Sequence, residues 1–143
     1  MCFISQSTHE VAKHPIKCYK VMNYWFAENN LYSLFYRRLP FKIGDEIRAA
    51  VDVPTDKLDY FEILEGEVVH SYTTYSRAKR VFDSIGLQRT ACIVECEIPE
   101  GVDYWVNNYD GEYASKKVII KNLITFFSSY NAGRHRRLIN RKQ

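Results

Sequence analysis

The sequence has little glycine and proline, and it has no long apolar run. Six Gly and four Pro among 143 residues are too few for a collagen-like or low-complexity disordered chain. No stretch of about 18 apolar residues is present, so no membrane-spanning helix is predicted. The first residues also lack the basic segment and apolar stretch of a secretory signal. We therefore expect a cytoplasmic protein with no membrane association.

Cysteine is also scarce, with four residues, Cys2, Cys18, Cys92 and Cys96. The spacing of Cys92 and Cys96 suggests a zinc site, but the segment around them has the pattern of a strand. Residues four apart on a strand share a face and lie roughly 13 Å apart, at about 3.3 Å per residue. A zinc ion needs every sulfur within about 2.3 Å, so no metal site is predicted. Reduced cysteines packed as small core residues are the favoured interpretation.

Acidic residues are absent from the last ten positions, and this changes the meaning of the net charge. The whole chain carries 20 basic and 17 acidic residues, a formal charge of +3. Five of the basic residues lie in the final segment: Arg134, Arg136, Arg137, Arg141 and Lys142. Without them the chain has 15 basic against 17 acidic residues, a charge of −2. We expect one domain over residues 1–133 and a basic tail over 134–143, which could contact phosphates in a salt-dependent way.

The remaining pattern indicates an α+β domain of short, mostly antiparallel strands with one clear helix. The helix is predicted over residues 73–85, because its apolar residues recur at helical spacing after a cap at Thr74 or Ser76. Strands are predicted over residues 16–22, 46–51, 68–72, 91–98 and 113–121, with an irregular connection after residue 22 that contains a short strand near 32–36.

Two of these strands carry predictions about their faces. In 91–98, Cys92, Val94, Cys96 and Ile98 share one face, and the glutamates on the other face predict a sheet wet on one side. In 113–121, Ala114, Val118 and Ile120 are expected to face the core, opposite Ser115, Lys117 and Lys121.

Several segments resemble, in this order, a family of small uncharacterised proteins from gut bacteria and their phages. They are CYKVM, LYSLF, FKIGDEI, GEVVHSYTTYSRAKR, ECEIPEGVDYW and GEYASKKVIIK, and they span roughly residues 16–122. Membership in that family implies no particular activity.

A more distant similarity is to ADP-ribosyltransferase exoenzymes, through HSYTTYSRAKRVF and CIVECEIPEG. This resemblance implies a split, two-sheet fold. Where that family has a Glu-x-Glu pair, this chain has Ser115 and Lys117, and Lys20 is the nearest basic residue to the family's first-block arginine. Loss of the carboxylate that stabilises the transition state argues against transferase activity, unless Glu112 or Glu97 replaces it.

The junction between strand 68–72 and the helix is the first candidate site. Backbone N–H groups at a helix N-terminus can receive an anion, so a nucleotide or phosphate contact at His70, Ser71 and Tyr72 is one interpretation. Partly buried residues with satisfied polar ends are the other. A full ligand site would also include Tyr19, Lys20 and Lys117. A Ser71–His70–Glu67 triad is excluded, because neighbouring strand residues point to opposite faces.

The segment DYWVNNYDGEY is the second candidate site. Asp103, Asp110 and Glu112 provide carboxylates, but they lack the regular spacing of a calcium loop, so a plain hairpin turn is favoured. The chain is also rich in tyrosine, with 11 residues, and aromatic side chains such as Trp105 and Tyr109 suit a contact surface as well as a core.

Together these features favour a non-catalytic interaction protein, with no cofactor. The resemblance suggests a phage or mobile-element accessory factor that binds a host or viral protein, or a protein–nucleic acid complex, with inhibition of a host defence complex as one such role. Trp105, Tyr109 and the basic tail would make the contacts. The alternatives are a divergent ADP-ribosyltransferase-like enzyme and a protein that binds and sequesters a nucleotide.

Overall fold

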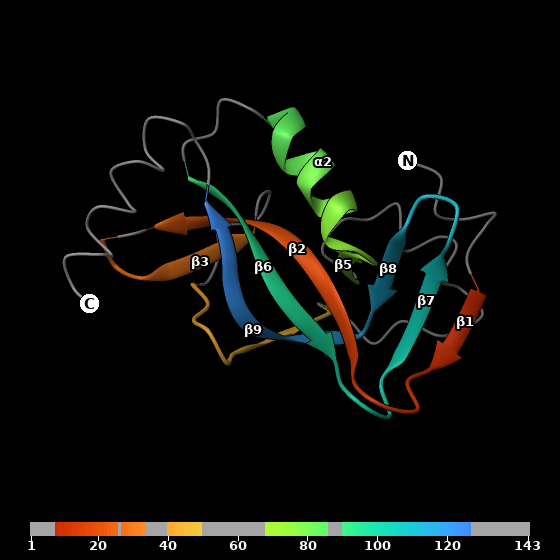
Figure 1. Cartoon of the computed structure of the whole chain (residues 1–143). Coiled ribbons are helices and arrows are strands. Elements are labelled where there is room, and N and C mark those ends of the chain that lie inside the picture. Colours follow the sequence, from red (N-terminus) through yellow and green to blue (C-terminus); the bar gives the residue numbers. More distant parts are fainter. Residues whose placement is uncertain (1–7, 26, 34–39, 50–67, 86–89, 127–143) are drawn as a thin grey trace.

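In its described part, the chain folds around one nine-stranded antiparallel sheet with one helix on it (Figure 1). The computed structural model describes residues 8–25, 27–33, 40–49, 68–85 and 90–126. The elements are β1 (Thr8–Val11), β2 (Ile16–Trp25), β3 (Asn30–Ser33), β4 (Glu46–Arg48), β5 (Val69–Tyr72), α2 (Tyr75–Ile85), β6 (Ala91–Ile98), β7 (Asp103–Asn107), β8 (Glu112–Ser115) and β9 (Lys117–Phe126). The predicted α+β architecture is confirmed.

The strand order is β1-β7-β8-β5-β2-β6-β9-β4, with β3 paired to β2 outside this path. Strands β2, β6 and β9 form a long, continuous part, and β1, β7, β8 and β5 form a second part beside it (Figure 1). The two parts meet in a single register pair, Tyr19 of β2 with Tyr72 of β5. Beyond that pair the same edge of β2 is taken by β3, so β2 has two partners on one side.

Helix α2 lies across β2 and β6, where it covers one face of the sheet (Figure 1). Its Ala78 and Phe82 pack on Val21, Ala91 and Ile93. The Thr74 hydroxyl oxygen accepts a hydrogen bond from the backbone N–H of Arg77 at 3.3 Å, which identifies Thr74 rather than Ser76 as the cap. The helix therefore begins two residues after the predicted start and ends at the predicted residue.

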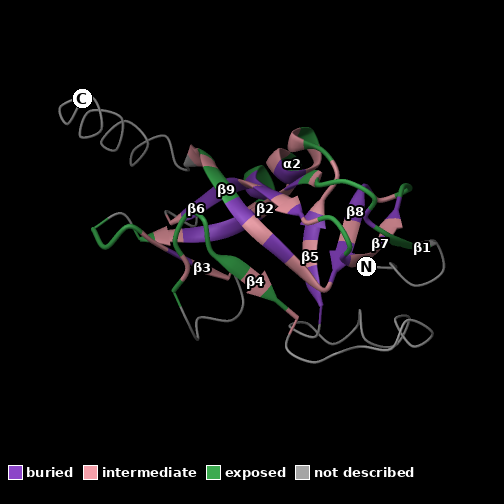
Figure 2. Cartoon of the chain, turned by 90° about the horizontal axis from the view of Figure 1, so that it is seen from below, coloured by how far each residue is buried: buried purple, intermediate pink, exposed green. Residues whose placement is uncertain are grey.

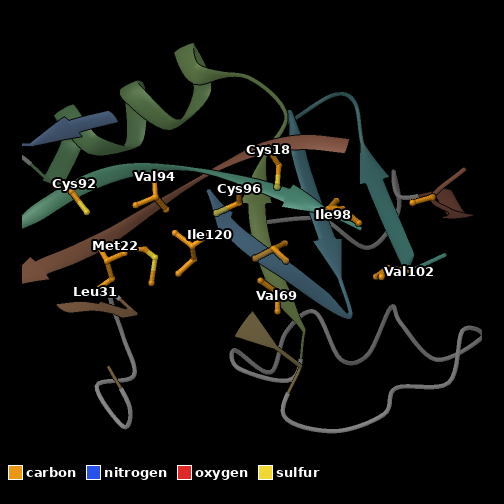
Figure 3. Close-up of a cluster of buried hydrophobic side chains, with 12 residues drawn as sticks. Cys18, Met22, Leu31, Val69, Cys92, Val94, Cys96, Ile98, Val102 and Ile120 are labelled. Atoms are coloured by element: carbon orange, nitrogen blue, oxygen red, sulfur yellow. The ribbon is translucent and has the colours of Figure 1, made fainter. Parts of the chain in front are cut away.

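The opposite face carries the larger core. This core includes Cys18, Met22, Leu31, Val69, Cys92, Val94, Cys96, Ile98, Val118 and Ile120 (Figures 2 and 3). Its members come from both parts of the sheet, so one apolar cluster holds the two parts together. The alternation predicted for β6 is confirmed, because Cys92, Val94, Cys96 and Ile98 all belong to this cluster.

Several predictions about strands are wrong in part. The face of β6 that carries the glutamates is not uniformly exposed to solvent, because α2 buries Ala91 and Ile93 there. The stretch after Met22 is not irregular throughout: β2 continues to Trp25 and forms a hairpin with β3, where Leu31 is buried. The short strand predicted near residues 32–36 begins earlier, at Asn30–Ser33, and residues 34–36 lie outside the described part of the chain.

The predicted strand over residues 113–121 is in fact two strands, β8 and β9, separated at Lys116. The break occurs because β8 pairs with β5 and β7, whereas β9 pairs with β6 and β4, so the chain passes from one part of the sheet to the other. Lys116 anchors the crossing, since its N–H donates to the Asp103 carbonyl and its ammonium lies 3.4 Å from the Asp103 carboxylate. Ser115, expected on a solvent face, is fully buried as a result.

Candidate functional site

The strand-to-helix junction brings five of the six predicted ligand-binding residues into one region. His70, Ser71 and Tyr72 form β5 just before α2, and Tyr19 and Lys20 lie on the adjacent part of β2. The sixth residue, Lys117, lies at the start of β9, where its ammonium is 3.7 Å from Glu46 on β4. Lys117 is therefore committed to the β4–β9 pair.

Strand alternation divides these five residues between the two faces of the sheet. Tyr19 and Tyr72 pack under α2 with Val21 and Phe82. Lys20 lies on the other face, in step with Cys18 and Met22, which belong to the large core. Ser71 is buried as well, so its hydroxyl offers no exposed contact. The predicted set thus does not line one ligand site.

Lys20 of β2 makes a side-chain contact with the backbone of β5. Its ammonium donates a 2.6 Å hydrogen bond to the backbone carbonyl of His70. Burial lowers the pKa of Lys20, and the Cys96 and Cys18 thiols oppose that effect. The main contact of Lys20 is therefore internal, to the backbone of a neighbouring strand.

His70 is neutral near pH 7 in this environment. Burial, and then the charge of Lys20, lower the pKa of His70 from 6.5 to about 4. A neutral imidazole provides no positive charge to a phosphate group, so His70 does not supply the cation that the predicted nucleotide site would need.

A carboxylate also lies close to this junction. Glu112 is the register partner of Tyr72, and its side chain is only 7% exposed. Burial, and then the nearby Asp110, raise the pKa of Glu112, and among the described residues its Oε2 has no hydrogen-bond partner. A negative group in this position opposes the binding of a phosphate at the helix N-terminus. Glu97, the other substitute carboxylate, lies on β6 and pairs with Lys121 at 3.6 Å.

The β7–β8 connection is a tight hairpin turn, as predicted. The N–H of Gly111 donates to the Asn107 carbonyl at 2.9 Å, and Gly111 has a φ of 67°, which favours glycine. The Asn107 side chain bridges the turn, accepting from the Asp110 N–H at 3.2 Å and donating to the Asp110 carboxylate at 3.1 Å. Within the described residues, no group of three or more His, Cys, Asp or Glu side chains could hold a metal ion.

Two contacts fasten this turn to the start of α2. The N–H of Thr73 donates to the Gly111 carbonyl at 2.9 Å, and the Arg77 guanidinium donates to the Tyr109 carbonyl at 3.3 Å. Arg77 lies so close to Gly111 that a Cβ there would be 2.9 Å from the Arg77 side chain. The side chain of Tyr109 meanwhile is 79% exposed. The result is an exposed tyrosine on a fixed backbone.

Trp105, which the sequence placed with Tyr109 on a contact surface, is buried. It is 2% exposed and packs against His9, with ring centroids 5.2 Å apart. β1 pairs with β7 here, and His9 lies directly opposite Trp105. Trp105 is therefore a core residue, and that prediction is wrong.

A second exposed aromatic lies at the end of β2, in an aromatic-rich stretch that the sequence predicts could serve as a contact surface or as core. Trp25 is 42% exposed and makes an edge contact with Tyr32 of β3, with ring centroids 6.4 Å apart. The sequence did not predict that Trp25 and Tyr32 would meet across a hairpin, because the stretch after Met22 fits neither a helical nor a strand period. The residues of the basic tail, 134–143, lie outside the described part of the chain.

No family model, curated protein or solved structure matches this chain in comparisons with known proteins. In the part of the chain described by the structure, no helix is long and apolar enough to cross a membrane. The geometry of the described residues is therefore the basis for a proposal about function.

Proposed function

We propose that this protein is a non-catalytic binding protein that recognises a macromolecular partner through the β7–β8 turn and its exposed Tyr109. The observation that carries the proposal is the combination of exposure and fixation at this residue. Tyrosine contributes a large, amphipathic contact area and loses little side-chain entropy on binding. A turn already held in its bound shape avoids the cost of ordering a loop.

The contacts around the turn are the reason to expect a fixed backbone there. Backbone and side-chain hydrogen bonds close it internally at Asn107, and Thr73 and Arg77 tie it to the helix. None of these bonds uses the phenol of Tyr109 in the described part of the molecule. The sequence had placed Tyr109 among the partner-binding residues, and its exposure supports that part of the prediction.

The partner class comes from the resemblance to gut-bacterial and phage proteins. It suggests a host or viral protein, or a protein–nucleic acid complex, with the protein as an accessory factor that acts in the cytoplasm. Inhibition of a host defence complex is one role of this kind. The basic tail would add contacts to an acidic surface or to phosphates, and these would weaken as salt increases.

We further propose that the sheet corresponds to the split sheet of ADP-ribosyltransferases without their activity. The single register pair between β2 and β5 supports a division into two parts. Ser115 is buried and Lys117 is paired with Glu46, so the two positions that replace the Glu-x-Glu pair carry no catalytic carboxylate.

The experiment is affinity capture from a lysate of a gut bacterium with the tagged full chain. Wild type, Tyr109→Ala and Ile43→Ala are compared, because Ile43 is also an exposed apolar residue, 48% exposed, in another turn. We expect a species that is retained by wild type and by Ile43→Ala and is lost with Tyr109→Ala.

Truncation after Gly133 separates the contribution of the tail from that of the turn. A species that is lost with the truncation but retained by Tyr109→Ala would assign recognition to the tail. That result, or the absence of any species that depends on Tyr109, would overturn the proposal.

A further inference from the structure

Two cysteines face each other across the centre of the sheet. Cys18 of β2 and Cys96 of β6 are direct register partners, and both belong to the same apolar cluster. Their side chains are 0% and 1% exposed, and Figure 3 shows them next to each other on the adjacent strands. Both are free thiols in this structure.

The geometry of this pair suits a disulfide. Directly opposite residues of antiparallel strands have Cα atoms about 4.5 to 5.5 Å apart. Disulfides join residues whose Cα atoms are about 4.4 to 6.8 Å apart. A bond between Cys18 and Cys96 therefore needs side-chain rotation and little movement of the backbone.

The surroundings of the pair activate one of its members. A hydrogen bond from the Cys96 thiol lowers the pKa of Cys18 against the opposing effect of burial, and the Ser71 hydroxyl and the Lys20 charge lower it further. The pKa of Cys96 is raised well above the usual thiol value by its interaction with Cys18 and by burial. Of the two thiols, Cys18 is thus the one whose thiolate is the more favoured.

Cys92 shows that this environment is specific to the pair. It lies on the same face of β6 and is equally buried, but its register partner is Met22. Burial raises the pKa of the Cys92 thiol to about 12. Cys92 has no cysteine opposite it, so it lacks the partner thiol that Cys18 and Cys96 provide for each other.

We propose that Cys18 and Cys96 form a redox-reactive dithiol, with Cys18 as the nucleophile, Cys96 as the resolving thiol and a small hydroperoxide as the oxidant. The Cys18 thiolate attacks one oxygen of hydrogen peroxide, the O–O bond breaks, and hydroxide leaves and takes up a proton to become water. The resulting sulfenic acid is attacked by the Cys96 sulfur, which loses its proton as a second water leaves. Two thiols and one peroxide thus give one disulfide and two waters. Because both thiols are buried, the proposal requires that hydrogen peroxide, which is little larger than water, reach them through a transient local opening of the folded chain.

Lys20 is a positioning residue in this reaction. It lies two residues after Cys18 on the same face, and its hydrogen bond to the His70 carbonyl holds its ammonium between β2 and β5. Its positive charge favours the thiolate of Cys18. In the reduced protein, the sulfur atoms of Cys96 and Cys18 raise the pKa of Lys20. Formation of the disulfide removes this effect, so the charged form of Lys20 becomes less favourable.

The test is oxidation of the folded full chain in a Cys2→Ser background, so that Cys18, Cys92 and Cys96 are the remaining cysteines. The probe is hydrogen peroxide, followed by rapid alkylation in denaturant and peptide mass mapping. We expect a Cys18–Cys96 cross-link with the loss of two hydrogen atoms, while Cys92 remains alkylatable. Cys92→Ser should leave the yield of the cross-link unchanged.

Further variants separate the roles of the three residues. Cys96→Ser should accumulate sulfenic acid on Cys18, which a dimedone probe would detect. Lys20→Met should slow the oxidation several-fold and shift its pH profile to higher pH, and Lys20→Arg should restore much of the rate because it keeps the charge. Oxidation of Cys92 as fast as Cys18, or a cross-link formed only in denaturant, would overturn the proposal.

Discussion

At the scale of single residues, burial changes the chemistry of the groups at the strand-to-helix junction. His70 was a candidate phosphate contact because it lies just before a helix N-terminus, but burial and Lys20 keep its side chain neutral. Glu112 looked like one of several loop carboxylates, yet it is buried beside Tyr72 with a raised pKa. Residue type suggested the position of the site, and the environment decides what each group can do there.

His70 makes a prediction for acid stability. Its pKa in the folded chain is about 4, below the ordinary value of 6.5. The unfolded chain therefore takes up a proton first as the pH falls, so stability contributed by neutral His70 is present above pH 6.5 and is lost between 6.5 and about 4. Urea unfolding of wild type across this window should show the decline, with a smaller slope for His70→Gln.

The matched control is His14→Gln, at an exposed histidine before β2. It should retain the wild-type slope. An imidazole resonance of His70 that titrates near 6.5 in NMR spectra would show that this account of the junction is wrong.

At the scale of elements, patterns with a clear period could be predicted and changes of partner could not. The helix and β6 follow from apolar residues at regular spacing, and their bounds agree closely with the prediction. The break at Lys116 has no local signal, because the sequence on both sides favours an extended chain. It arises from which strands lie beside β8 and β9, and a single sequence does not contain that information.

The candidate site likewise has features that local sequence patterns predict and features that depend on contacts between distant segments. The junction and the β7–β8 turn were found from local patterns of helix capping and turn residues. The Cys18–Cys96 pair was missed, because 78 positions separate the two residues and only the register of β2 and β6 makes them neighbours. Arg77 was missed for a similar reason, since its contact with the Tyr109 carbonyl joins two distant segments.

Thr74 gives a prediction at the element scale. Its hydroxyl caps α2 by accepting from the Arg77 N–H, so Thr74→Ala should lower the free energy of unfolding by about 1 kcal/mol. Ser76→Ala is the control, because Ser76 contacts Thr74 at 3.3 Å but caps no N–H in the described structure. Equal losses for the two variants, measured by urea unfolding, would contradict the assignment of the cap.

At the scale of the whole molecule, the two parts of the sheet share one core but only one register pair between β2 and β5. The second part holds the β7–β8 turn, and the helix on the first part holds that turn in place through Arg77. The position of Tyr109 thus depends on contacts between segments far apart in the chain. This arrangement is the physical basis of the proposed binding function.

The claim that a fixed turn presents Tyr109 to a partner is tested most directly by the dissociation constant for the captured partner. We compare this constant between Gly111→Ala and Gly44→Ala. Both glycines have positive φ, so each alanine adds backbone strain, but only at Gly111 does the new Cβ meet Arg77, at 2.9 Å. We predict that Gly111→Ala, with Tyr109 intact, weakens binding by about tenfold, equivalent to about 1.4 kcal/mol. Gly44→Ala should bind like wild type. Equal affinity for the two variants, both folded by circular dichroism, would contradict the claim that a fixed turn presents Tyr109 to a partner.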